Sequence, residues 1–227
     1  MNTTGIIDLN RYYRLAKGIC RRFTVKEIML LCGCAAFNFL IYYGARLIAA
    51  GHPHFSLAVS YDEAIPFLPW TILVYWGCYP VWAVSYLLGT ITGRGDGYRF
   101  LKAHYIGEAI CFLFFVLTPT FMVRPEVAGM DIASRLVLFT YSIDAPDNLF
   151  PSIHCFASWL CWAGLRTKKR IPVWYKGFTF AMALCVCLCT LTVKQHVIAD
   201  VLGGILLAEL SYLLAGGFAV SPKNRSF

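Results

Sequence analysis

The sequence predicts an all-α integral membrane protein, folded as a six-helix bundle with both termini cytoplasmic. Composition is the first reason. Of 227 residues, 59% are hydrophobic and only 14% are charged, whereas about a quarter of the residues in a soluble domain are charged. The second reason is a series of six apolar runs, most of them near the ~20 residues that a helix needs to cross a bilayer. The length leaves no room for a sizeable soluble domain.

The predicted elements follow one another along the chain. Residues 1–26 carry six Lys/Arg among aromatic and aliphatic residues and are expected to lie as a basic amphipathic segment on an anionic membrane face. This stretch lacks the small-residue cleavage site of a signal peptide. Residues 27–218 are expected to form a six-span membrane domain, and residues 219–227 a cytoplasmic tail. The six expected spans are 27–49, 67–91, 104–122, 153–165, 174–193 and 197–218.

Loop charges predict the orientation of these spans. Sixteen of the twenty Lys/Arg lie in the amino-terminal segment, the 93–103 loop, the 166–176 loop and the tail, all on one side of a six-span arrangement. The positive-inside rule makes that side cytoplasmic. The 50–66 loop, the 123–152 loop and the 194–196 turn then lie outside. We expect a multi-pass plasma membrane protein whose candidate site faces away from the cytoplasm.

Composition also argues against several other classes of protein. The net charge of +8 comes from short loops beside apolar runs, which is typical of membrane orientation and not of a nucleic-acid surface. The ten cysteines include pairs two residues apart within apolar runs, where a disulfide is geometrically unfavourable. No internal repeat supports a transporter built from paired halves. The expected partners are the lipid bilayer and a membrane lipid substrate, with no prediction of oligomeric state.

The first candidate catalytic pair is His196 and Asp200. Their spacing of four places both on one face if the segment is helical. The carboxylate would then hold one imidazole nitrogen and leave the other as a nucleophile. A lone pattern of this kind also occurs by chance, so it is weak evidence by itself.

The second candidate group is Pro151-Ser152-Ile153-His154. Pro151 can open a helix at its first turn, where the free amides, together with the Ser152 hydroxyl, suit an anionic group. His154 would then protonate a leaving alkoxide. The alternative is a capped helix start with an incidental histidine.

Further polar residues on the outer side are candidates for binding phosphate or a head group. Arg124 can clamp phosphate with its planar guanidinium, or it can simply anchor a helix end. Lys194 can add positive charge, or it is a solvated turn lysine. Possible substrate-binding residues are Asp62, Asp144 and Asn148, although a solvated loop is the plainer interpretation of Asp62.

Two glutamates, Glu108 and Glu209, lie within expected spans. Ionisable residues at membrane depth are costly and are often functional. We expect instead that both pair with basic residues near the inner leaflet.

Together the motifs resemble the type 2 phosphatidic acid phosphatase superfamily of integral membrane enzymes. The resemblance rests on Asp144-x-Pro-x-Asn-x-Phe-Pro-Ser-x-His154 and Lys-Gln-His196-x-x-x-Asp200-x-x-x-Gly204, and it covers about residues 60–215. It is strongest toward the branch related to sphingomyelin synthases and inositol phosphotransferases. The resemblance implies that His196 is the nucleophile, Asp200 orients it and His154 is the acid/base. It further implies phosphate binding by Arg124 and Ser152, with no metal and no cofactor.

The sequence departs from the family pattern at three phosphate-binding positions. Leu117 stands where the family has Lys, and Cys189 and Thr190 stand where it has Ser and Arg. Fewer cations favour a phosphodiester over a more highly charged monoester. We therefore expect a membrane lipid phosphatase or head-group phosphotransferase that acts through a phosphohistidine. One alternative is a lipid or isoprenoid (pyro)phosphate phosphatase that uses water as acceptor. The non-enzymatic alternatives are a lipid transporter or scramblase and a scaffold, and these need no nucleophile.

Overall fold

The structure, a computed structural model, describes residues 25–91 and 94–216. Within these ranges the chain forms α-helices and one 3-10 turn, which confirms the all-α prediction. The predicted amphipathic segment, apart from its last two residues, and the predicted tail lie outside the described residues. The elements in chain order are α2 (Val25–Ala49), α3 (Ser60–Ala64), η1 (Pro69–Thr71), α4 (Ile72–Ile91), α5 (Arg94–Leu117), α6 (Ile132–Ile143), α7 (Ile153–Leu165), α8 (Val173–Thr192) and α9 (Ile198–Gly216).

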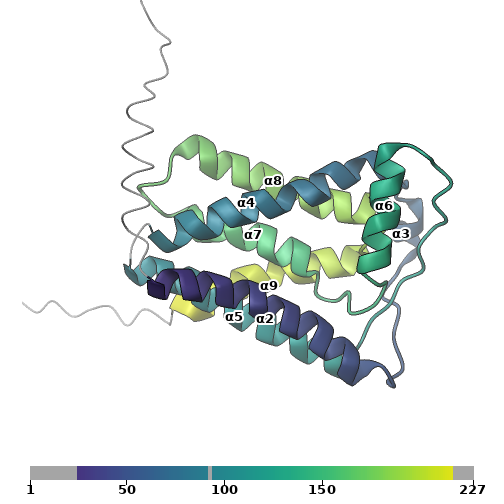
Figure 1. The fold of residues 1–227 in the computed structure, drawn as a ribbon, viewed down its shortest axis with the longest axis horizontal. Helices are drawn as coiled ribbons and strands as arrows, with labels where there is room; N and C mark the ends of the chain where they lie inside the picture. Colours follow the sequence, from purple (N-terminus) through teal and green to yellow (C-terminus); the bar gives the residue numbers. More distant parts are fainter. Residues whose placement is uncertain (1–24, 92–93, 217–227) are drawn as a thin grey trace, which may run out of the picture.

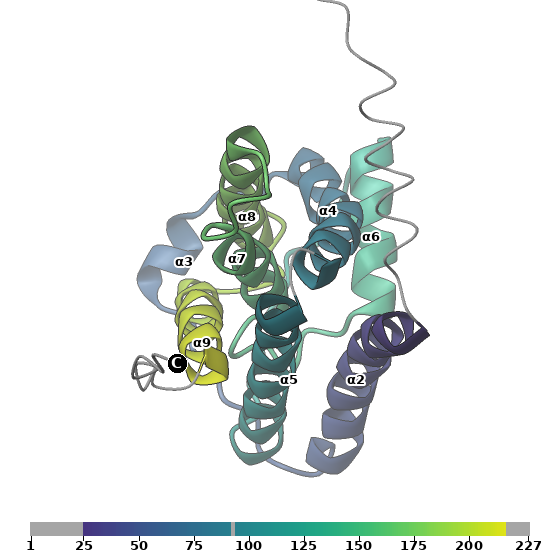
Figure 2. The same cartoon turned by 90° about the vertical axis from the view of Figure 1, so that its left-hand side faces the viewer.

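The long helices form a bundle with α7 in its interior. Helices α2, α4, α5, α7, α8 and α9 run along the long axis, and the short helices α3 and α6 lie at the same end (Figure 1) but on opposite sides of the bundle (Figure 2). Helix α7 packs against α4, α5, α8 and α9, and a view turned by 90° shows these helices around it (Figure 2). Most side chains of α7 are buried.

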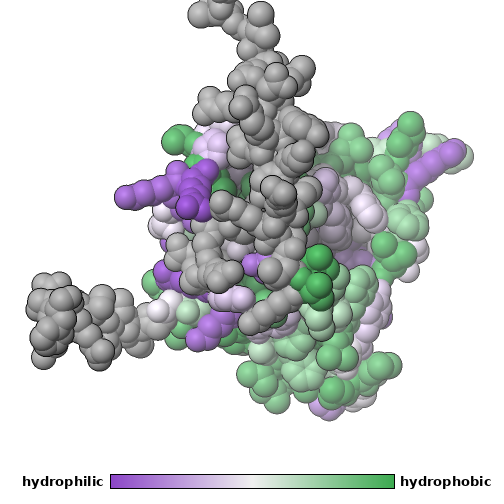
Figure 3. Space-filling model, turned by 60° about the vertical axis from the view of Figure 1, so that its left-hand side comes forward, coloured by the Kyte–Doolittle hydropathy of each residue, from purple (hydrophilic) through white to green (hydrophobic). Residues whose placement is uncertain are grey.

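Five helical segments are long and apolar enough to cross a membrane: α2, η1 with α4, α5, α8 and α9. Helix α7 has 13 residues and is shorter than a usual span. Large apolar side chains point outward from the spanning helices, among them Leu47 and Leu206, and apolar side chains are widespread on the face drawn in Figure 3. Such a surface suits a lipid environment, because soluble proteins rarely expose large apolar patches.

The predicted spans agree with the helices except in one case. Five of the six differ from the observed elements by at most two residues at either end. The third was predicted at 104–122 after a basic loop, whereas α5 already begins at Arg94, so this boundary was wrong. Phe100 and Leu101 are buried in the bundle, and Arg99 donates two hydrogen bonds, of 3.1 and 2.9 Å, to the carbonyl oxygen of Tyr212. These contacts stabilise the polar first turns of the helix.

Two segments predicted as loops contain helices, and that prediction was also wrong. Helix α6 lies within the predicted 123–152 loop, and α3 lies within the 50–66 loop. Asp131 caps α6 by accepting hydrogen bonds from the amides of Ala133 and Ser134 at 2.9 and 3.1 Å. The helix then buries Val137 and Thr140, and the indole of Trp76 donates to the Thr140 hydroxyl at 3.1 Å.

The two intramembrane glutamates have different partners. Glu209 accepts two hydrogen bonds from Arg166, at 2.6 and 2.7 Å, which confirms the expected ion pair. Glu108 is fully buried and accepts a hydrogen bond from the side chain of Asn38 at 2.8 Å instead of pairing with a basic residue. The prediction for Glu108 was therefore wrong. When its carboxyl group is protonated, Glu108 can bond to the Asn38 amide without placing a charge inside the bundle.

A close approach between α7 and α9 brings the two candidate motifs together. A Cβ atom added to Gly204 would lie 2.6 Å from the carbonyl oxygen of Ser152 and 2.9 Å from the Cβ of Cys155. The Ser152 amide also donates to the carbonyl oxygen of Asp200 at 3.0 Å. Glycine at position 204 therefore allows the starts of the two helices to touch.

We expect Gly204→Ala to destabilise the protein by about 1–3 kcal/mol, because the added methyl group meets backbone atoms that cannot rotate away. Thermal unfolding in detergent, followed by circular dichroism, measures the effect. Gly177→Ala in α8 is the matched control, since a Cβ there has no neighbour within 4 Å. Equal melting temperatures for the two variants would contradict the role given to Gly204.

Candidate active site

Three side chains singled out in the sequence meet at the end of the bundle where α7 and α9 begin. His154 is the second residue of α7, His196 lies in the turn between α8 and α9, and Asp200 is the third residue of α9. The ring centroids of His154 and His196 are 6.1 Å apart. One phosphate group placed between the rings could contact both, because each contact needs only about 3 Å.

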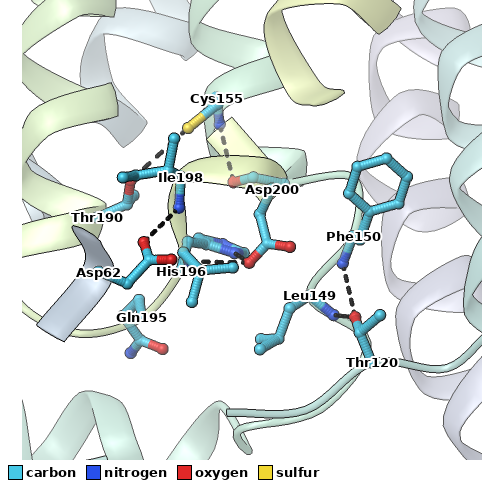
Figure 4. Close-up of polar contacts among 12 residues, drawn as sticks. Asp62, Thr120, Leu149, Phe150, Cys155, Thr190, Gln195, His196, Ile198 and Asp200 are labelled. Carbon is cyan, nitrogen blue, oxygen red and sulfur yellow. Dashed lines mark hydrogen bonds and ion pairs between the residues drawn. The ribbon is translucent and has the colours of Figure 1, made fainter. Parts of the chain in front are cut away.

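The pairing of His196 with Asp200 is confirmed, although its local geometry differs from the prediction. His196 Nδ1 lies 3.3 Å from Asp200 Oδ2, and the same oxygen accepts a hydrogen bond from the Val197 amide at 3.0 Å (Figure 4). Helix α9 begins only at Ile198, so the carboxylate reaches back to the turn rather than along a helical face. Because Asp200 engages Nδ1, Nε2 remains the nitrogen that can attack a substrate.

The charge of Asp200 controls the protonation of His196. Burial lowers the pKa of the imidazole, but the hydrogen bond and the negative charge of Asp200 together raise it by more, so the pKa lies above its ordinary value. Asp200 is fully buried. A buried carboxylate next to an imidazole stabilises the positive charge that develops on the ring when Nε2 forms a bond.

Aromatic residues of α4 hold His154 from one side. The ring of Tyr75 lies 4.4 Å from that of His154, centroid to centroid, and the ring of Trp82 lies at 5.6 Å. The Tyr79 hydroxyl lies 3.2 Å from His154 Nε2. These contacts limit the rotation of the imidazole and give one of its nitrogens a polar neighbour.

Arg124 reaches the turn that carries His196. It donates hydrogen bonds to the carbonyl oxygen of Asp144, at 2.6 Å, and to the side-chain oxygen of Gln195, the neighbour of His196. Its guanidinium stacks on the Tyr141 ring, 4.3 Å from the centroid. Its Nε and the Nε2 of Gln195 are buried without a partner, which leaves two donors available for an anion.

The Asp144 carboxylate is held by two tyrosines. The hydroxyl of Tyr42 in α2 donates to Oδ1 at 2.5 Å, and the hydroxyl of Tyr75 donates to Oδ2 at 3.2 Å. Since Tyr75 also stacks on His154, Asp144 connects α2 to the candidate acid/base.

Lys194 and Asp62 make contacts that differ from their predicted roles. The Lys194 ammonium donates to the carbonyl oxygens of Asp62 and Ile65 at 2.8 and 2.7 Å, so its donors are directed to α3 and not to the group around His196. The Asp62 carboxylate accepts a hydrogen bond from the Ile198 amide at 2.8 Å (Figure 4) and another from the Val59 amide at 2.9 Å. Both residues thus fasten α3 to the start of α9.

Ser152 and Asn148 lie on the segment that leads into α7. Ser152 is fully buried and caps α7, where its hydroxyl accepts a hydrogen bond from the Cys155 amide at 3.3 Å. The Thr120 hydroxyl accepts hydrogen bonds from the amides of Leu149 and Phe150 at 3.0 and 2.9 Å, which fixes the preceding turn (Figure 4). Asn148 is 4% exposed, has a φ of 53°, and has no partner for either side-chain amide atom.

Sequence reasoning missed several residues that complete the site. Tyr75, Tyr79 and Trp82 follow one another at intervals of four and three residues, which is the spacing of one helical face, and this spacing could have identified an aromatic wall. Gln195 is 1% exposed, but nothing in the sequence except its place next to His196 marks it. The hydroxyl of Thr120 carries no recognisable pattern.

The positions where the sequence departs from the family pattern carry no charged side chain. Leu117 is 71% exposed at the end of α5. Cys189 is buried against Ile72 and Tyr75. The Thr190 hydroxyl is buried and donates to the carbonyl oxygen of Cys187 at 2.9 Å. Arg124 is therefore the cation that the described structure sets beside His196.

Within the described ranges, no group of three or more His, Cys, Asp or Glu side chains has the arrangement of a metal site. Comparison with known proteins gives no relative for this chain: no protein-family model, no curated protein and no solved structure matches it.

We expect Asp62→Ala to destabilise the protein by about 0.5–2 kcal/mol, because two backbone amides lose their acceptor. Glu63→Ala is the matched control, since Glu63 is the exposed neighbour in α3. Thermal unfolding in detergent compares the two variants. A large loss of substrate affinity in Asp62→Ala at unchanged melting temperature would instead favour the predicted contact with substrate.

Proposed function

We propose that this protein is a membrane lipid phosphatase or head-group phosphotransferase that acts through a phosphohistidine at His196. The observation that supports this most directly is the pair of imidazoles 6.1 Å apart, one of them held through Nδ1 by a buried carboxylate. Transport, lipid scrambling and scaffolding need no nucleophile. The resemblance to the type 2 phosphatidic acid phosphatases provides the same assignment of roles.

The proposed reaction has two steps. In the first, His196 Nε2 attacks the phosphorus atom, the bond from phosphorus to the leaving oxygen breaks, and His154 gives that oxygen a proton. In the second, water or an alcohol attacks the phosphorus, His154 takes its proton, and the nitrogen–phosphorus bond breaks. Asp200 stabilises the positive imidazole ring in both steps, and Arg124 compensates charge on the phosphate oxygens.

The supply of positive charge favours a phosphodiester as substrate. Arg124 is the cation beside His196, whereas the Lys194 ammonium is bound to two carbonyl oxygens. A phosphodiester carries one negative charge, and a phosphomonoester carries close to two at neutral pH. A second charge in a partly desolvated site without a second cation is costly. We therefore infer that diester phospholipids are better substrates than phosphatidic acid.

Purified protein incubated with a panel of lipids tests both proposals. Mass spectrometry should detect products from phosphatidylglycerol, phosphatidylinositol or phosphatidylethanolamine at higher rates than phosphate release from phosphatidic acid. His196→Ala should lower turnover by at least about a thousandfold, because it removes the nucleophile. His52→Ala, at an exposed histidine in the loop after α2, is the matched control. Full activity of His196→Ala would rule out the phosphohistidine.

The pH dependence of kcat/KM provides a separate test. A phosphodiester whose leaving group is 4-nitrophenolate needs no proton from His154, so for this substrate only neutral His196 is required, and the rate should rise with pH through the pKa of this residue, which Asp200 raises. In Asp200→Asn the negative charge is lost, and the midpoint of the rise should move to lower pH while the maximal rate falls. A midpoint that stays in place, or moves upward, would show that Asp200 does not control the protonation of His196.

We also propose that the site faces away from the cytoplasm, on the basis of the loop charges. Two variants, Met130→Cys and Lys169→Cys, test this. Met130 lies between α5 and α6 at the end of the bundle that carries the site, and Lys169 lies between α7 and α8 at the opposite end. Both positions are exposed. A membrane-impermeant maleimide added to intact cells should label the first variant above the wild-type background and leave the second unlabelled. The reverse pattern would place the site on the cytoplasmic side.

A further inference from the structure

A pocket of about 490 Å³ lies between the end of α2 and the segment that leads into α7. Its volume is within the range of small-molecule sites, about 300–1,000 Å³. Neither the aromatic wall of α4 nor the His196–Asp200 pair lines it. The lining includes Tyr43, Arg46 and Leu47 of α2, His54 of the following loop, and Asp147 and Asn148.

Contacts between side chains connect this pocket to the catalytic histidines. The guanidinium of Arg46 lies 5.9 Å from the centroid of the Tyr42 ring, and the Tyr42 hydroxyl donates to Asp144. Asp144 also accepts a hydrogen bond from Tyr75, whose ring stacks on His154. The pocket wall and the acid/base are therefore two parts of one packed group.

Asn148 is a lining residue whose side chain has unused hydrogen-bonding groups. The residue is 4% exposed, and both its amide nitrogen and its amide oxygen are buried without a partner. Among the described residues, it is the side chain in which a donor and an acceptor are both unpaired. Native proteins rarely leave such atoms unpaired, because each costs roughly 1–3 kcal/mol. A ligand group that donates and accepts would satisfy both.

The charges that line the pocket balance each other. Arg46 Nε lies 3.1 Å from Asp147 Oδ1, so the cation and the anion neutralise one another. His54 contributes an imidazole whose Nδ1 lies 3.0 Å from the carbonyl oxygen of His52. A phosphate would be repelled by Asp147, and an ammonium would be repelled by Arg46. Hydroxyl groups meet neither penalty, and each can both donate and accept a hydrogen bond.

We propose that this pocket binds the uncharged polyol part of the substrate, and that Arg46, Asp147 and Asn148 recognise its hydroxyl groups. This inference rests on the proposed function, because it places an alcohol next to the phosphate at His196. The polyol has two possible sources: the head group of the donor lipid, or a free polyol that accepts the phosphoryl group. Both present the same hydroxyl chemistry to the pocket.

Binding of free glycerol and myo-inositol to the His196→Ala protein in detergent, measured by saturation-transfer NMR, tests the pocket without any turnover. The protein should bind at least one of the two. Adding Ala50→Trp, which places an indole at a position that lines the pocket, should abolish the signal. Adding Ala36→Trp makes the same change at an exposed position nearer the middle of α2 and should leave the signal unchanged.

Asn148→Gly tests the role of the amide itself. Glycine is the appropriate replacement because the φ of 53° would strain alanine. Affinity for the polyol should fall about tenfold, as expected for the loss of two hydrogen bonds. Failure of both polyols to bind, or binding that neither Ala50→Trp nor Asn148→Gly weakens, would overturn the proposal, as would stronger binding of phosphocholine or inorganic phosphate in the same pocket.

A competition assay separates the two sources. Short-chain phosphatidylglycerol should displace the free polyol if the pocket holds the donor head group, whereas the free polyol should remain bound beside this lipid if it is the acceptor. Short-chain phosphatidylmethanol, which lacks a polyol, is the control and should not displace it. Polyol binding with no lipid turnover by the wild-type protein would retain the pocket and reject the catalytic proposal, so the two failures are distinguishable.

Discussion

The structure depends on the junction between the starts of α7 and α9, where Asp200 occupies the centre. Its carbonyl oxygen accepts a hydrogen bond from the Ser152 amide, and its carboxylate contacts His196 Nδ1 and the Val197 amide. One buried residue thus fixes the segment that carries His154 and the turn that carries His196. Gly204 allows the two backbones to come close enough for these contacts.

The remaining polar groups at this end of the bundle support the junction from outside. Lys194 and Asp62 connect α3 and the residue after it to the α8–α9 turn and the start of α9 through three hydrogen bonds, two from the Lys194 ammonium and one from the Ile198 amide to the Asp62 carboxylate. Arg124 connects the 144–150 segment to Gln195. Buried polar groups of this kind stabilise one arrangement only when their hydrogen bonds are largely satisfied. Unpaired donors and acceptors occur at Arg124, Gln195 and Asn148, beside the candidate site and the pocket.

Sequence patterns within single segments predicted most of the helices and the contact between His196 and Asp200. The features that were missed depend on contacts between segments that are distant in the sequence. Apolar runs located the helices at five of the six expected spans, and the spacing of His196 and Asp200 predicted their contact. The start of α5 was missed because its first turns are polar and are stabilised by Tyr212, more than a hundred residues away. Lys194 was expected to bind phosphate because a turn lysine beside a histidine is consistent with that role. Only the folded chain shows carbonyl oxygens of α3 within reach of its ammonium.

The partners of Arg124 have a consequence for turnover under the proposed function. Its guanidinium bonds to the Asp144 carbonyl oxygen and the Gln195 amide oxygen. An incoming phosphate must compete with these neutral acceptors, and they can bond to the guanidinium again when the phosphate leaves. The net affinity for a phosphate group is then smaller than that of a bare arginine. Such a site would hold its product weakly, so accumulated product would inhibit the enzyme little and its release would not limit the rate.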